Sequence, residues 1–205
     1  MRTRVKICGF TRVEDAVAAA RLGVDAVGLV FYPLSPRYVG IEQASAIVRA
    51  LPAFVTVVAL FVDQTRSHVE EVLQRVAIDT LQFHGNESAD FCRSFGRPYI
   101  KALAMRRDMD FTALEREYND AAGLLLDTYR PDAKGGTGSR FDWNLMPSES
   151  TLPIILAGGL TPDNARQAIA QTRPYALDVS SGVETGKGIK DAAKMAAFLQ
   201  EVSLQ

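Results

Sequence analysis

The 205-residue sequence has few residues that commonly bind metals or form disulfides, with two cysteines and two histidines. Cys8 and Cys92 lack metal-site spacing, and a disulfide is not expected in a reducing compartment. The longest apolar run, residues 54–62, is broken by Thr56 and is far too short to span a bilayer. The amino terminus is polar and basic with no apolar signal region, so we expect a cytoplasmic protein. From the short apolar runs and the scarce cysteines and histidines we expect no membrane partner and no metal site.

An excess of either charge is also missing. The chain has 23 Lys and Arg against 24 Asp and Glu, for a net charge of −1. No basic run indicates nucleic-acid binding, and no polybasic helix indicates a membrane surface. A hydrophobic content of 47% is enough for one sizeable core, so we predict a single domain over residues 1–205.

Short apolar stretches alternate with helical patterns eight times along the chain. The predicted strands lie near residues 5–8, 25–31, 55–62, 79–84, 99–105, 123–127, 153–157 and 176–179. Eight such units in this length predict an α/β fold, a single (βα)₈ TIM barrel. A doubly wound open sheet is the alternative, but no Gly-x-Gly-x-x-Gly follows the first strand.

The first strand runs directly into a predicted helix. Thr11 is placed to cap that helix, with Glu14 three residues on as a capping box. Two other residues are predicted to have no role in chemistry: Cys92 packs in the core, and His68 lies on the exposed side of its helix.

Cys8 and Asp127 end the first and sixth predicted strands. In barrels this end of the strands carries the chemistry. The thiolate of Cys8 can remove a proton. The apolar stretch 124–126 before Asp127 disfavours its charged carboxylate, and so favours the protonated form that can act as an acid. A closed barrel places the two on opposite sides of one mouth. The structural alternatives are an inert buried cysteine and a loop-capping aspartate.

Lys6 shares the inward strand face with Cys8, because side chains alternate along a strand. A buried lysine needs a partner, and Asp178 on the neighbouring eighth strand is the obvious candidate. The pair is either purely structural or sets the potential at Cys8. Gln82 and His84 also share a face, and His84 either lines the pocket or is a hydrogen-bonded structural histidine.

Glycine-rich turns follow the seventh and eighth predicted strands. Barrels commonly hold phosphate at this place through backbone N–H groups and a helix amino terminus. The sequence therefore predicts a phosphate site formed by Gly158, Gly159, Ser180, Ser181 and Gly182. The long loop containing residues 135–138 either covers a substrate or is an ordinary flexible loop.

Six motifs, taken together and in this order, resemble phosphoribosylanthranilate isomerase along the whole chain. They are residues 6–9, 35–37, 81–85, 135–138 with 141–143, 157–160 and 178–184. Phe83 stands where that family more often has leucine, which is a conservative difference.

The resemblance implies a monomeric or homodimeric (βα)₈ barrel of tryptophan biosynthesis. It further implies an Amadori rearrangement of N-(5'-phosphoribosyl)anthranilate, a phosphosugar, without metal or organic cofactor. By resemblance, Cys8 is the general base, Asp127 the general acid and Arg37 the binder of the substrate carboxylate. Arg37 lies in a loop stiffened by two prolines, which favours a binding role over that of an ordinary surface arginine.

Two other functions compete with the isomerase. One is another phosphosugar barrel, such as an epimerase. A metal-dependent epimerase would need inward histidine and aspartate ligands on several strands, and the sequence has only two histidines. The other is a non-catalytic barrel that binds a phosphorylated ligand, against which the presence of both Cys8 and Asp127 argues.

Overall fold

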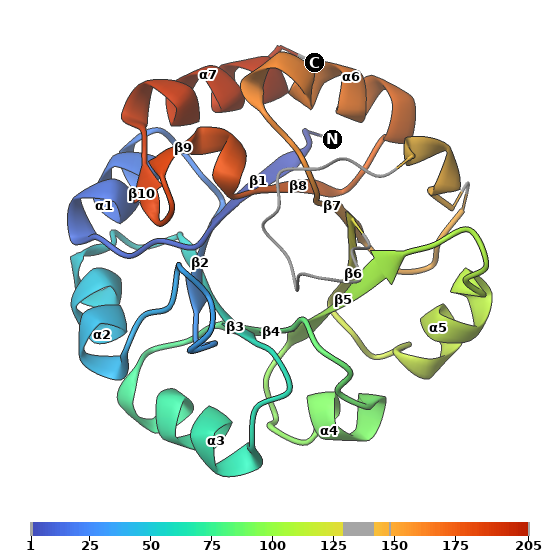
Figure 1. Cartoon of the computed structure of the whole chain (residues 1–205), viewed down its shortest axis with the longest axis horizontal. Helices are drawn as coiled ribbons and strands as arrows, with labels where there is room; N and C mark the ends of the chain where they lie inside the picture. The colour runs from blue at the N-terminus through green and yellow to red at the C-terminus, as the bar shows by residue number, and fades with distance from the viewer. Residues whose placement is uncertain (1, 129–141, 148, 205) are drawn as a thin grey trace.

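The computed structural model describes residues 2–128, 142–147 and 149–204. Its centre is a closed barrel of eight parallel strands, each paired with the next along the chain (Figure 1). The strands are β1 Arg4–Cys8, β2 Ala26–Val30, β3 Thr56–Phe61, β4 Thr80–Phe83, β5 Tyr99–Met105, β6 Gly123–Thr128, β7 Ile154–Leu156 and β8 Ala176–Val179. Pairing of β8 with β1 closes the ring, so the predicted (βα)₈ barrel is confirmed.

Helices surround the barrel (Figure 1). They are α1 Val13–Arg21, α2 Ile41–Ala50, α3 Arg66–Arg75, α4 Ala89–Arg93, α5 Phe111–Glu117, α6 Pro162–Thr172 and α7 Ala192–Ser203. Short 3₁₀ helices, η1 Trp143–Leu145 and η2 Ser181–Val183, and a small hairpin of β9 Glu184–Gly186 with β10 Ile189–Lys190 complete the elements. Across the described ranges, the helices are too short or too polar to cross a membrane.

Alternation along the strands divides the buried residues into two sets. Outward residues such as Ile7, Leu29 and Leu124 join the main core under the helices. Inward residues form smaller clusters inside the barrel, one around Leu125 and another that includes Cys8. The strand pattern therefore turns Cys8 into the barrel, as its sequence position predicted.

The first helix begins differently from the prediction. Thr11 does not cap α1, which starts at Val13 after an N-cap residue, Arg12, whose side chain makes no capping hydrogen bond. The Thr11 hydroxyl instead donates to the carbonyl oxygen of Gly188 at 2.6 Å. The expected capping box is wrong because this hydroxyl ties the first loop to the β9–β10 hairpin.

Cys92 and His68, the two residues predicted to have no role in chemistry, have different surroundings. Cys92 is fully buried in the core, as expected. His68 is half-buried rather than external, and its ring stands edge-on to Phe61 with centroids 6.3 Å apart. The expectation for His68 was wrong because helix α3 turns the imidazole onto the aromatic cluster beneath it.

Candidate functional site

A buried ion pair lies inside the barrel beside Cys8. The Lys6 Nζ atom donates to both carboxylate oxygens of Asp178, at 3.0 and 2.9 Å. The side chains are only 5% and 7% exposed, and the two residues are register partners on β1 and β8. The predicted pairing is confirmed, and a buried lysine obtains the charged partner that it needs.

Cys8 is almost completely buried at the end of β1. Burial raises the pKa of its thiol above the ordinary value, and the Asp178 carboxylate adds to this, while the Lys6 and Lys190 cations oppose it. Gly28 on β2 leaves the space for this thiol, because a Cβ atom there would lie 2.7 Å from Sγ. Burial and Asp178 therefore favour the neutral thiol of Cys8, whereas Lys6 and Lys190 favour its thiolate.

A second set of polar side chains connects β4 with β6. His84 follows β4, and its Nε2 atom lies 3.2 Å from Oδ2 of Asp127, while its Nδ1 atom lies 3.0 Å from Nε2 of Gln82. The Gln82 amide nitrogen can only donate, so Nδ1 accepts and the proton sits on Nε2, directed at Asp127. The other Asp127 oxygen accepts from the backbone N–H of Thr128 at 2.7 Å. The carboxyl group is thus oriented by two contacts.

Arg37 is buried and already has a partner. Its Nε and Nη2 atoms donate to the two carboxylate oxygens of Glu184, at 2.8 and 2.7 Å. Gly9, with φ of +83°, packs so closely that a side chain there would overlap the Arg37 side chain. Arg37 therefore lies directly over the turn that follows Cys8.

Sequence reasoning gave no role to Glu184 and did not consider Lys190. Lys190 on β10 is fully buried in its side chain and donates to Oε1 of Glu184 at 2.7 Å. It also donates to the carbonyl oxygen of Cys8 at 2.5 Å. Nothing in the surrounding sequence distinguishes this lysine from the exposed Lys187, so no local signal would have identified it.

The glycine-rich turns after β7 and β8 pack against each other. Gly158 and Gly159 have φ of +84° and +63°, in the left-handed region that favours glycine. A side chain at Gly182 would overlap the carbonyl oxygen of Leu160. Close packing thus requires small residues here whether or not an anion binds, and η2 begins at Ser181 within the same cluster.

Ser180 has a structural contact at the same place. Its hydroxyl donates to the carbonyl oxygen of Cys8 at 2.9 Å. This leaves its backbone, rather than its side chain, for any bound phosphate. The predicted covering loop with residues 135–138 lies outside the described residues, as does Phe141, whereas Trp143 begins the short 3₁₀ helix η1.

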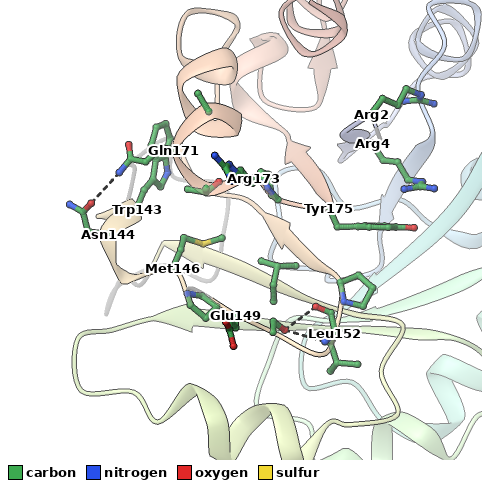
Figure 2. Close-up of a pocket in the computed structure, with 17 residues that line it drawn as sticks. Arg2, Arg4, Trp143, Asn144, Met146, Glu149, Leu152, Gln171, Arg173 and Tyr175 are labelled. Carbon is green, nitrogen blue, oxygen red and sulfur yellow. Dashed lines mark hydrogen bonds between the residues drawn. The ribbon is translucent and has the colours of Figure 1, made fainter. Parts of the chain in front are cut away.

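A separate cavity of about 780 Å³ lies at the opposite, amino-terminal end of the strands (Figure 2). Its wall includes Arg4, which begins β1, and Tyr175, which directly precedes β8. The Arg4 guanidinium stands 4.4 Å from the centre of the Tyr175 ring. None of the predicted site residues lines this cavity, and in this fold that face usually serves stability.

Ionisable side chains gather instead where β1, β4, β6 and β8 end, inside the barrel. Barrel enzymes place their reacting groups at these carboxyl ends. The fold and this arrangement put the chain in the class of (βα)₈-barrel enzymes.

Comparison with known proteins gives the family. Residues 5–201 match the family model described as N-(5'phosphoribosyl)anthranilate (PRA) isomerase. A protein of that name from Nitrosococcus oceani is 57% identical over 202 residues, which cover 98% of each chain. The chain belongs to this family and is an isomerase of tryptophan biosynthesis.

Solved structures agree with this assignment. A monomeric form of the dimeric isomerase of Thermotoga maritima is 36% identical, with a TM-score of 0.87 over 99% of this chain and 100% of that one. An isomerase in complex with reduced 1-(o-carboxyphenylamino)-1-deoxyribulose 5-phosphate is 35% identical, with a TM-score of 0.84 and the same coverage.

Proposed function

We propose that the chain converts N-(5'-phosphoribosyl)anthranilate to 1-(2-carboxyphenylamino)-1-deoxyribulose 5-phosphate, with Asp127 as general acid and Cys8 as general base. The observation that carries these assignments is the placement of both side chains at strand ends inside one barrel, each held by neighbouring polar groups. The proposal includes one catalytic domain over residues 1–205, acting in the cytoplasm as a monomer or homodimer.

The first step is opening of the ribose ring. Asp127 gives its proton to the furanose ring oxygen, the bond from that oxygen to C1 breaks, and an iminium forms between C1 and the anthranilate nitrogen. His84 and the Thr128 N–H keep the carboxyl group aimed while this occurs. An acid that is already oriented loses little entropy on reaching the transition state.

The second step is removal of the proton on C2. The Cys8 thiolate takes this proton, and the electron pair shifts towards the iminium nitrogen to give an enolamine. The enolamine tautomerises to the ketose product as C1 gains a proton and the C2 hydroxyl loses one. The raised pKa of Cys8 keeps its thiolate fraction small. Lys6 and Lys190 provide the positive charge that supports the thiolate when it forms.

The two ends of the substrate bind away from the reacting carbons. We assign its phosphate to backbone N–H groups of Gly158, Gly159, Ser180, Ser181 and Gly182 at the ends of β7 and β8. A guanidinium has five N–H donors, so the two Glu184 contacts of Arg37 leave three for the anthranilate carboxylate. His84 and Asp178 complete the proposed pocket.

The test uses freshly made phosphoribosylanthranilate, whose fluorescence is lost as it isomerises. The purified wild-type protein is expected to remove this fluorescence, and an Asp127→Asn variant at equal concentration is the control. Loss at equal rates with both proteins would reject the assignment of Asp127. Substrate binding without any loss of fluorescence would instead favour a non-catalytic binding barrel.

A further inference from the structure

Lys190 is a buried cation that connects parts of the chain far apart in sequence. Besides Cys8 and Glu184, its Nζ atom donates to the carbonyl oxygen of Ser180 at 3.2 Å. Its side chain has no exposed area, so its hydrogen bonds go to protein groups and not to solvent. A lysine in this position acts on the interior, through the groups that it touches.

Glu184 is the second member of this network. Its Oε1 atom accepts from both Arg37 Nε and Lys190 Nζ, while Oε2 accepts from Arg37 Nη2. Burial opposes ionisation of Glu184, but the bonds from Arg37 and the attraction of Lys190 outweigh it and lower the pKa of the carboxyl group. The carboxylate stays ionised and bridges two cations.

These contacts join three segments of the mouth. Lys190 holds the end of β1 and the turn after β8, and through Glu184 it also holds the loop after β2. The hairpin that carries both residues is fixed in turn, since the backbone N–H of Lys190 donates to Asp15 on α1 at 2.9 Å. Figure 1 shows this β9–β10 hairpin beside α1.

We propose that Glu184 and Lys190 are positioning residues that fix Arg37 and Cys8 relative to each other, which rests on the function proposed above. Glu184 sets the direction of the Arg37 guanidinium, and therefore where the substrate carboxylate binds. Lys190 holds the backbone that carries Cys8 and places a positive charge beside its thiol.

Several charges act on the Cys8 thiol. Lys6 lies on the same strand, Asp178 on β8, Lys190 on β10, and Arg37 in the loop after β2. Removing the Lys190 cation takes away one of the groups that favour the thiolate. The Cys8 titration is therefore expected to move to higher pH when Lys190 is replaced.

The matched control is a second buried lysine. Lys101 pairs with Glu87 at 2.9 Å, with side chains 4% and 3% exposed, and donates to the carbonyl oxygen of Gly85. It does not contact Cys8 in the described structure. Lys190→Met and Lys101→Met each remove one buried cation and keep a similar apolar stem.

The experiment measures kcat, KM and the pH dependence of Cys8 alkylation by iodoacetamide, with the Cys8 peptide followed by mass spectrometry. For Lys190→Met we expect kcat/KM to fall about 10–100-fold, the size that small misplacements of reacting groups produce. We also expect the alkylation profile of Cys8 to move to higher pH. Lys101→Met should leave that profile at its wild-type position.

The near-isosteric Glu184→Gln variant tests the network if Lys190→Met does not fold. It is expected to raise KM more than it lowers kcat, because the Arg37 guanidinium loses its charged partner. A wild-type alkylation profile in Lys190→Met, or an unchanged KM in Glu184→Gln, would overturn the inference. Absence of turnover by the wild-type protein would count against the proposed function instead, since the alkylation comparison does not depend on that substrate.

Discussion

The imidazole of His84 lies 3.2 Å from the carboxyl group of Asp127, so β4 and β6 meet through a hydrogen bond at the barrel mouth. Gln82 lies two residues earlier on the same strand face, and its amide nitrogen faces the Nδ1 atom of His84. Because this nitrogen can only donate, it favours the tautomer of His84 with the proton on Nε2. We propose that His84 orients the carboxyl group of Asp127, the proposed acid.

Asp127→Asn is expected to remove most turnover. The amide keeps the shape of the side chain and its contact with Thr128, but it cannot supply the proton for ring opening. A loss of about 10²–10⁴-fold in kcat is expected for a missing acid. Steady-state fluorescence assays measure it, with the exposed Asp163→Asn as control, and turnover by Asp127→Asn equal to that of the control would exclude the acid role.

Arg37→Ala is expected to weaken substrate binding much more than it slows the chemical step. Truncation of one partner in a buried charge pair typically costs about 2–5 kcal/mol. The variant also leaves Glu184 with Lys190 as its one charged side-chain partner among the described residues, which is a separate cost to folding stability and not to binding. KM and kcat are measured together, with the exposed Arg49→Ala as control, and an unchanged KM would remove Arg37 from the carboxylate site.

How much of this site the sequence could reveal depends on how local each contact is. The Lys6–Asp178 pair followed from strand alternation and barrel closure, two regular features. The Thr11 contact with Gly188 spans 177 residues, and the Arg37 contact with Glu184 spans 147. Both bonds depend on how the β9–β10 hairpin folds back onto the barrel mouth. The sequence around Thr11 or Arg37 contains no pattern that specifies this.

Gly28→Ala is expected to reduce kcat while the barrel stays folded. A Cβ atom at this position would lie 2.7 Å from the Cys8 Sγ and 3.1 Å from Lys6 Nζ, so the thiol must move. A shift of this kind near a reacting group can cost about 100-fold in rate. Gly40→Ala is the control, because a Cβ atom there meets no atom within 4 Å. Equal kcat values for the two variants would contradict the close packing argued for Cys8.

Phosphate or sulfate is expected to bind at Gly159, Ser181 and Gly182. We expect the backbone N–H groups at the start of η2 and in the turn after β7 to bind the anion, because unpaired N–H groups attract negative charge. Crystals grown with either anion should show density there. Density confined to the amino-terminal cavity, with this site empty, would reverse the assignment.

The central claim is that Cys8 removes the C2 proton, and a Cys8→Ala variant assayed with substrate deuterated at C2 tests it most directly. We expect kcat to fall about 10²–10⁴-fold while substrate still binds. Cys8→Ser should be nearly as slow, because a hydroxyl is a far weaker base near neutral pH. Residual turnover of Cys8→Ala should show a larger isotope effect than that of Asp127→Asn, since ring opening is spared and proton removal is not. Turnover of Cys8→Ala at the wild-type rate would make Cys8 a structural residue and contradict the mechanism.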